Sequence, residues 1–361
     1  MIPIYSPRVY SDSAEKALKS GWISSQGEYI DLATRTLKEL FGVPYVVLMN
    51  NGTSATHMLI QSLKFKHPDL TKIYVPNSVF VAVWNTVLYE YPREILEVLD
   101  TDPTTLNIRT DESYIKSLAT GSAVIIVHNI GNIVNVPRLK RLRPDLIFVE
   151  DNCEGMFGQY EGIFSGTSEA SLCSAVSFFA NKTITSGEGG AFFTHDKELY
   201  KFIYKTIHHG ATSTRYVYDI LGRNYRMTNI QAALLYDQLT HVNTIRNDKH
   251  AIFSAYKKLL GQLVVIPRTE ERTSPSEWMF VCGLKNIHYE GLEEYMKSYG
   301  IDIRPFFYDI SVHTHLKGIQ SQQILTNDIT YFMLPSFPDL PLEKVEYICT
   351  TLIGFTCSVL D

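Results

Sequence analysis

The chain of 361 residues is 45% hydrophobic and 20% charged, and its net charge at pH 7 is −5. This length predicts about two domains, and the hydrophobic content is sufficient to fill their cores. Because the net charge is negative and the basic residues are scattered along the chain, nucleic acid is not expected as a partner.

The cysteines and the N-terminal segment exclude further classes of protein. The five cysteines show neither CxxC nor His-rich spacing, so neither a metal site nor a disulfide framework is predicted. The opening segment, MIPIYSPRVY, lacks the basic and apolar regions of a signal peptide, and the apolar runs are too short to cross a bilayer. We therefore expect a cytoplasmic protein without a membrane partner.

In the first two-thirds of the chain, short apolar runs alternate with helical patterns. Strands are predicted at 45–49, 73–77, 123–128, 146–151, 175–180 and 189–195, with helical patterns at 55–63, 79–90 and 137–144. Continuous Val, Ile and Phe strands that alternate with helices are typical of a mostly parallel α/β sheet covered on both faces. Ligands bind such sheets at the carboxyl ends of the strands, where the polar clusters NNGTS, EDN and NKT fall.

The last third of the chain predicts a second, smaller unit. A long helical pattern runs from 227 to 260, and Thr228 is its expected N-cap, with Gln231 in the capping-box position. Beyond it, apolar runs at 279–286 and 301–308 flank a helical pattern at 290–300. We expect a large domain at 1–245 and a small C-terminal α+β domain at 246–361.

The segment NNGTS (50–54) lies between a predicted strand and the start of a predicted helix. There the amides of Gly52, Thr53 and Ser54, together with two hydroxyl groups, would face a phosphate at the positive end of the helix. An ordinary turn with a hydroxyl cap explains the same residues, and the motif alone favours that simpler interpretation.

Asp151 and Lys182 indicate a more specific chemistry. A carboxylate at the end of a buried strand, such as Asp151, needs a partner. A lysine among apolar and small residues, such as Lys182, is a usable nucleophile. Pyridoxal phosphate (PLP) requires this pair, an amine for its aldehyde and an anion for its protonated ring nitrogen. A turn-capping aspartate and a solvated loop lysine are the alternatives, and Ser177 with the glycines of GEGG (187–190) favours the cofactor site.

Three further side chains are candidates for binding. Phe80 follows the second predicted strand, where it could lie flat on an aromatic ring, although a core phenylalanine is the simpler interpretation without that context. Arg226 and Arg304 are candidates for holding anions, because guanidinium groups match carboxylate and diphosphate oxygens. Exposed arginines are common, so each of the two has little weight alone.

Taken together, the motifs resemble those of the DegT/StrS-type family of sugar-nucleotide aminotransferases, over nearly the whole chain. The matching segments, in the family's order, are SGWISSQGEYI (20–30), NNGTSATH (50–57), VEDNCEG (149–155), SFFANKTITSGEGG (177–190), NYRMTNIQAAL (224–234), RPFFY (304–308) and LPSFPDL (334–340). The resemblance implies the aspartate aminotransferase-like fold (PLP fold type I). It also implies a homodimer in which both subunits build each active site.

The resemblance assigns roles to individual residues around the cofactor. It implies that Lys182 forms the Schiff base with PLP, that Asp151 pairs with the pyridine nitrogen, and that Phe80 stacks on the ring. It implies phosphate contacts from Thr53 and Ser177.

Other implied roles belong to the partner subunit and to the substrate. Asn224 is expected to reach the phosphate from the neighbouring subunit. The residues expected near the sugar nucleotide are Trp22, Ser24, Ser25 and Gln26.

The sequence departs from the family pattern at three places. Glu154 stands where many members have Gln or His beside the ring oxygen of the cofactor. VFVAVWNTV (79–87) replaces a version with smaller residues, and Met333 replaces the usual glycine.

Within the family the motifs are most similar to perosamine- and viosamine-forming enzymes of polysaccharide biosynthesis. This similarity implies amino transfer from L-glutamate to a nucleotide-diphosphate 4-keto-6-deoxy sugar, with the cofactor passing through pyridoxamine phosphate (PMP). A 3-dehydratase or a 3-aminotransferase of the same fold is the alternative, but the dehydratases carry a histidine at the position of Lys182. A non-enzymatic regulator is less favoured because the chain keeps the lysine and has no DNA-binding appendage.

Overall fold

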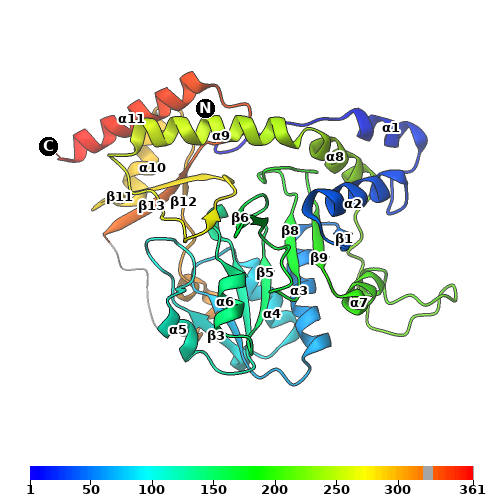
Figure 1. Ribbon diagram of the computed structural model, residues 1–361. Helices are drawn as coiled ribbons and strands as arrows, with labels where there is room; N and C mark the ends of the chain where they lie inside the picture. Colours follow the sequence, from blue (N-terminus) through cyan, green and yellow to red (C-terminus); the bar gives the residue numbers. More distant parts are fainter. Residues whose placement is uncertain (320–327, 361) are drawn as a thin grey trace.

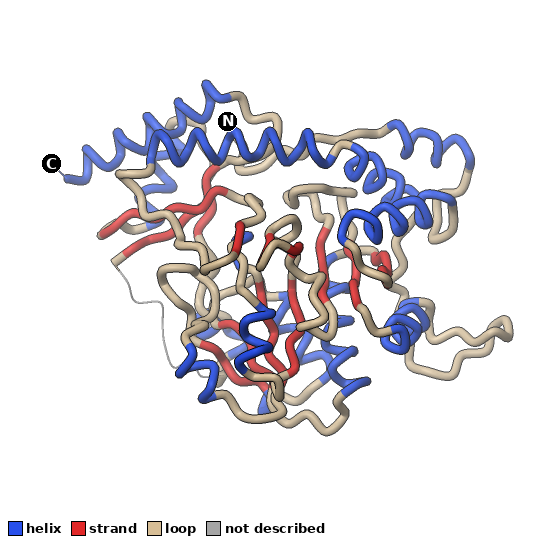
Figure 2. The backbone as a smooth tube through the Cα atoms, in the orientation of Figure 1, coloured by secondary structure: helices blue, strands red, loops and turns tan. Residues whose placement is uncertain are grey.

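The computed structural model describes residues 1–319 and 328–360. Seven strands form the central sheet, with helices around it (Figure 1, Figure 2). Across the sheet their order is β1 (Tyr45–Met49), β9 (Gly190–Thr194), β8 (Ser174–Ser177), β5 (Ile147–Asp151), β4 (Ala123–Val127), β2 (Ile73–Pro76) and β3 (Leu96–Leu99). Strand β9 is antiparallel to β1 and β8, and the remaining neighbours are parallel.

Helices cover both faces of this sheet because alternate residues of each strand point to opposite sides. One face, with Val47 and Ile125, packs against α3 (Gly52–Lys66), α4 (Ala82–Glu90) and α7 (Lys197–Ile207). The other face packs against α1 (Asp12–Ser20), α2 (Glu28–Phe41) and α8 (Asn229–Thr240) at the β1 end, and against α5 (Glu112–Ser117) and α6 (Val136–Leu142) at the β3 end. The predicted fold class is therefore confirmed.

The helical pattern from 227 to 260 forms two helices rather than one. Helix α8 ends at Thr240, and α9 (Val242–Leu260) begins directly after His241. The capping box at the start of α8 is confirmed, because Thr228 and Gln231 each accept a hydrogen bond from the other's backbone N–H. Beyond the break, α9 packs beside α11 (Leu342–Leu360) (Figure 1).

The C-terminal region builds a second core. Its antiparallel sheet has the order β11 (Phe280–Lys285), β13 (Ile329–Leu334) and β12 (Arg304–Pro305), and it is covered by α9, α10 (Tyr289–Ser298) and α11. The boundary predicted near residue 245 falls inside α9, so the division into 1–245 and 246–361 stays a prediction.

The remaining elements are short. They are β6 (Gln159–Tyr160), β7 (Ile163–Phe164) and β10 (Thr273–Ser274), and the 3₁₀ turns η1 (Arg93–Ile95), η2 (Asn129–Gly131), η3 (Ile310–Val312) and η4 (Thr314–Leu316). Within the two described ranges, no helix combines the length and the apolar character that a membrane crossing requires.

Candidate active site

A cavity of about 700 Å³ lies where the carboxyl ends of β1, β5 and β8 meet the start of α3 and the second sheet. This is the edge at which parallel sheets bind ligands. Many of the predicted site residues line the cavity together: Gly52, Thr53, Phe80, Asp151, Glu154, Ser177, Lys182 and Arg304.

The start of α3 forms a narrow cradle against the end of β8. A Cβ atom on Gly52 would lie 2.6 Å from both Cβ and Oγ of Ser177, so only glycine fits there. Asn51 caps the helix by accepting the N–H of Ser54 (2.8 Å). That bond occupies the Ser54 amide, whereas Gly52 and Thr53 line the cavity and their amides are the candidates for holding a phosphate. The phosphate contacts of Gly52, Thr53 and Ser54 stay predictions.

Asp151 ends β5 as a buried carboxylate whose two oxygens both accept hydrogen bonds. Thr56 Oγ1 donates to Oδ2 (2.9 Å), and the Cys153 backbone N–H donates to Oδ1 (3.1 Å). Sequence reasoning missed Thr56, although it lies one helical turn after Gly52 and therefore on the same face of α3. The two bonds fix the plane of the carboxylate at the cavity wall.

Lys182 lies in the loop between β8 and β9, with a side chain that is 13% exposed. Its Nζ lies 3.6 Å from Glu154 Oε1 and 4.2 Å from the centroid of the Trp278 ring. The Tyr5 hydroxyl donates to the Lys182 carbonyl oxygen (2.8 Å), and Trp278 Nε1 donates to the carbonyl oxygen of Asn181 (2.9 Å). The loop is thus held on two sides.

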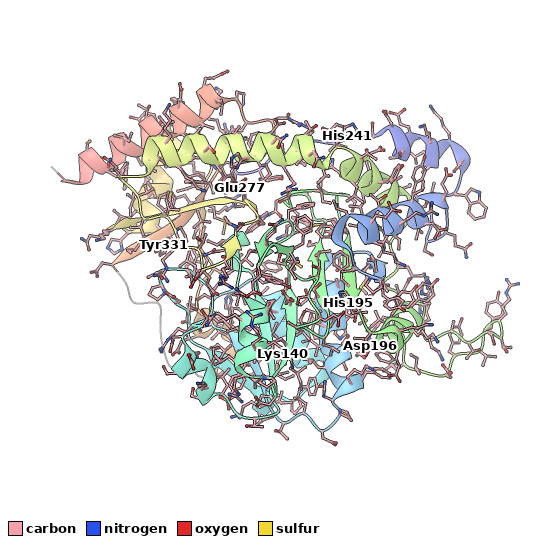
Figure 3. All side chains as sticks on the ribbon, viewed as in Figure 1. Lys140, His195, Asp196, His241, Glu277 and Tyr331 are labelled. Atoms are coloured by element: carbon pink, nitrogen blue, oxygen red, sulfur yellow. The ribbon has the colours of Figure 1, made fainter. Side chains whose placement is uncertain are left out.

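The segment that carries Trp278 is itself anchored to α9. Glu277 Oε1 lies within hydrogen-bond distance of Nδ1 of His250 in α9 (3.1 Å). Figure 3 shows Glu277 below this helix. The Trp278 carbonyl oxygen accepts a hydrogen bond from the buried Nζ of Lys249 (2.8 Å). Neither Tyr5 nor Trp278 was predicted from the sequence, because no motif links them to the loop that they hold.

Glu154 is buried beside Lys182. Its Oε2 accepts the backbone N–H of Ile130 (2.8 Å), and its Oε1 faces the Lys182 ammonium. Burial raises the pKa of the Glu154 carboxyl, the Lys182 ammonium opposes that rise, and the charge of Asp151 adds to it.

Phe80 and Arg304 also line the cavity. Phe80 is 56% exposed, which rules out the core phenylalanine, and its ring centroid lies 6.5 Å from that of Phe307. Arg304 pairs with Asp302 (Nη1 to Oδ1, 2.7 Å), while its side chain remains 52% exposed. Both side chains are accessible to a ligand.

The residues expected near the sugar nucleotide lie together, outside the lining of this cavity. Arg226 Nε donates to Ser25 Oγ (3.2 Å). Asn229 donates through Nδ2 to the carbonyl oxygen of Trp22 (2.7 Å) and through its backbone N–H to the carbonyl oxygen of Ser24 (2.6 Å). The backbone of Arg226 forms an isolated antiparallel β-bridge with Met49 at the end of β1. The roles of Trp22, Ser24, Ser25, Gln26 and Arg226 stay predictions.

Asn224 is exposed and does not line the cavity of its own chain. Its backbone pairs with that of His208, directly after α7, so the two residues close the segment between α7 and α8, which projects from the body of the molecule (Figure 1). Along this segment Tyr216, Tyr218 and Leu221 are 75%, 54% and 83% exposed. An exposed Asn224 is compatible with the expected role in a neighbouring subunit, which stays a prediction.

The fold and the cavity define a PLP-dependent aminotransferase. Residues 10–353 match the DegT/DnrJ/EryC1/StrS aminotransferase family, and the chain belongs to this family. The chain is 30% identical to the GDP-perosamine synthase of Escherichia coli O157:H7 and 29% identical to that of Vibrio cholerae, over 98% of this chain and 98% and 99% of the relatives. Among solved structures, an E. coli GDP-4-keto-6-deoxy-D-mannose 3-dehydratase with bound hydrated PLP superposes with a TM-score of 0.84 at 21% identity, over 98% of this chain and 99% of that chain.

The residues of the cavity fit PLP. The cradle of Gly52, Thr53 and Ser177 offers amides and hydroxyls to a phosphate. Ser177 lies so close to Gly52 that no side chain fits at Gly52. Asp151 supplies a fixed anion and Lys182 an amine in the same cavity. The described ranges contain no group of three or more His, Cys, Asp or Glu side chains that could hold a metal ion.

Proposed function

We propose that this protein transfers the amino group of L-glutamate to C4 of a nucleotide-linked 4-keto-6-deoxy sugar. The observation that carries the proposal is that Lys182, Asp151 and the cradle at Gly52 line one cavity. The sugar is inferred from the relatives named GDP-perosamine synthase, which match this chain over almost their whole length. The same relatives favour GDP as the nucleotide, so the expected product is GDP-perosamine.

When bound, PLP supplies an electron-withdrawing ring that lets a carbon next to nitrogen lose and regain a proton. Asp151, held by Thr56 and by the Cys153 amide, would accept a hydrogen bond from the protonated ring nitrogen. The Lys182 amine moves the proton at the reacting carbon, first when glutamate gives up its nitrogen and again when the sugar receives it. Tyr5 and Trp278 hold the Lys182 loop through two carbonyl oxygens, which limits where the amine can reach.

The phosphate and the ring are bound by other elements of the chain. Gly52 and Thr53 offer amides at the start of α3, and Ser177 offers a hydroxyl from the end of β8. Phe80, which is exposed at the mouth of the cavity, is available to lie on the ring. Together these residues would hold the cofactor in the cavity that contains Lys182.

Lysine at position 182 favours amination over dehydration. A dehydratase of this fold must remove a hydroxyl group without transferring nitrogen, and the resemblance associates that reaction with histidine at this position. An amine at Lys182 could instead move the proton in both halves of a transamination and bind the cofactor again when the amino sugar leaves, while water releases 2-oxoglutarate in the first half.

We further propose that the working molecule is a homodimer. The projecting segment between α7 and α8 exposes Tyr216, Tyr218 and Leu221, and such a cluster of large apolar side chains is typical of a contact surface. The same segment ends in Asn224 and Arg226, next to the end of β1. A second copy that covers this segment would bring Asn224 to the partner's phosphate site.

The test of the reaction is a panel of nucleotide 4-keto-6-deoxy sugars with the GDP, UDP and dTDP carriers. Each is incubated with the PLP-loaded protein and L-glutamate, and NMR locates the new nitrogen. We expect 2-oxoglutarate together with a sugar that carries nitrogen at C4 and keeps its C3 hydroxyl, with GDP as the preferred carrier. Loss of the C3 hydroxyl without gain of nitrogen would identify a dehydratase and overturn the proposal.

A further inference from the structure

We propose that Glu154 is a further catalytic residue, which takes the proton of the Lys182 ammonium whenever that lysine reacts as a free amine and returns it afterwards. The inference rests on the proposed function, because it requires Lys182 to attack the aldehyde of PLP. It assigns a reacting partner to an acid whose role the sequence left open.

The first support is the isolation of the Glu154 carboxylate. The side chain is 6% exposed, and its oxygens have two compensating contacts, the Ile130 N–H at 2.8 Å and the Lys182 ammonium at 3.6 Å. A buried carboxylate with a single N–H partner is costly. If Lys182 lost its proton to water, Glu154 would be left as a buried carboxylate with a single N–H partner. Transfer of the proton from Lys182 to Glu154 avoids this cost.

The second support is the local structure that holds Glu154 in place. Ile130 has a φ of 57°, a conformation that is rare for a β-branched residue and costs free energy. This turn directs the Ile130 N–H to Glu154 Oε2. Ser276 Oγ donates to the Glu154 carbonyl oxygen (2.6 Å), and a Cβ on Gly131 would lie 2.2 Å from that Ser276 oxygen. Main chain and carboxylate are therefore both fixed beside Lys182.

The third support is that Asp151, another acid that lines the cavity, is already engaged. Both oxygens of Asp151 already accept hydrogen bonds, from Thr56 and from the Cys153 amide. Burial and the charge of Asp151 raise the pKa of Glu154, which favours its protonated form once the Lys182 charge is gone. The other titratable side chains that line the cavity are Cys153, Glu188, Arg304, Tyr308 and His313.

The transfer is balanced within the pair. An Nζ–H bond of Lys182 breaks, its electron pair stays on nitrogen as the lone pair that attacks, and an O–H bond forms on Glu154 Oε1. The ammonium–carboxylate and amine–acid forms contain the same number of protons. The fraction of reactive amine is therefore independent of pH as long as the pair holds one proton.

The experiment measures how fast the cofactor-free protein captures PLP covalently, by rapid mixing and absorbance, between about pH 6.5 and 8.5. The wild-type rate is expected to change less than about threefold across this range, because no proton leaves the pair. In Glu154→Gln, the amide cannot accept the proton, so Lys182 must release it to water. The rate of this variant is expected to rise about tenfold per pH unit.

Two controls separate this effect from changes in binding or folding. PMP has the same ring and phosphate but no aldehyde, so its affinity for Glu154→Gln is expected to stay within about threefold of wild type at each pH. Glu188→Gln removes an exposed acid from the same cavity and is expected to keep the flat profile.

The outcomes distinguish the inference from the proposed function. Equal pH slopes in wild type and Glu154→Gln, or a tenfold slope in the wild type itself, would overturn the role of Glu154 while leaving PLP capture intact. The wild-type slope decides the matter even if Glu154→Gln does not fold. A wild-type protein that captures no PLP at any pH would instead refute the proposed function.

Discussion

Single side chains decide whether this cavity can hold a cofactor, and Asp151 depends most on its neighbours. Its carboxylate is buried at the end of β5, and its orientation is set by Thr56 from α3 and by the Cys153 amide. Hydrogen bonds to a buried charge are among the stronger ones, since the unpaired charge has no water to replace the lost partner.

Replacing Thr56 by valine keeps the shape of the side chain and removes the donor to Asp151. We expect Thr56→Val to lower the free energy of unfolding of the cofactor-free protein by about 1–3 kcal/mol. Thr56→Ser keeps the hydroxyl and is expected to lose less than about 1 kcal/mol. Urea unfolding at neutral pH measures both, and equal stabilities for valine and serine would contradict the assigned role of this bond.

Gly52 is the second residue with a strict requirement. A Cβ there would meet the Cβ and Oγ of Ser177 at 2.6 Å, so Gly52→Ala must push α3 away from β8. We expect a loss of about 1–3 kcal/mol in unfolding free energy and weaker binding of PLP. The matched control is Gly291→Ala in α10, where nothing lies within 4 Å, and there we expect a gain of about 0.4–1 kcal/mol. Equal effects at the two positions would refute the cradle.

At the scale of elements, the sequence predicts the site residues that follow strand ends. It does not predict the contacts that distant segments make with the Lys182 loop. Asp151, Ser177 and Lys182 follow apolar strands, and neighbouring strand ends share one edge of a sheet, so their meeting could be predicted. Tyr5 and Trp278 contact the Lys182 loop across 177 and 97 residues of sequence. No local pattern encodes such contacts, because they depend on how segments far apart in the sequence pack together.

The buried Lys249 in α9 predicts a pH dependence of the stability of the protein. Lys249 is 1% exposed and donates to the carbonyl oxygens of Trp278 and Ser336, at 2.8 Å each. Burial lowers the pKa of Lys249 to about 7, so the folded protein binds fewer protons here than the unfolded chain above that pH. Stability contributed by this site therefore rises as the pH increases from about 7 toward the unfolded value of about 10.4.

The measurement compares wild type with Lys249→Met by urea unfolding between about pH 7 and 9. Relative to the methionine variant, wild type is expected to gain up to about 1.4 kcal/mol per pH unit in this range. Lys249→Arg, which stays charged, is the control and is expected to be less stable than wild type at the upper end. Parallel curves for wild type and Lys249→Met would mean that Lys249 stays charged in the folded protein.

At the scale of the whole molecule, one chain brings together the amine, the anion and the cradle, and we propose that a second copy adds the remaining part. The cavity contains the amine, the anion and the cradle, whereas Asn224 and the apolar segment around Tyr218 are exposed and lie outside its lining. The sequence resemblance predicts that both subunits build each site, and the exposed position of Asn224 is compatible with that prediction.

A homodimer predicts a particle of twice 41.1 kDa in solution. Placing charge on the projecting segment, by Tyr218→Asp with Leu221→Asp, should shift the protein toward the single-chain mass, because buried unpaired charges weaken an interface. The matched control is Leu259→Asp, which places a charge at an exposed leucine of α9, away from the segment. Light scattering measures all three, and a wild-type protein of single-chain mass would contradict the dimer.

The most direct test of the central claim is borohydride reduction of the purified protein after incubation with PLP. The account predicts a visible absorbance band that disappears on reduction, and a peptide containing Lys182 that carries the added mass of the reduced cofactor. Label on another lysine, or a colourless protein with no label after incubation with PLP, would contradict it.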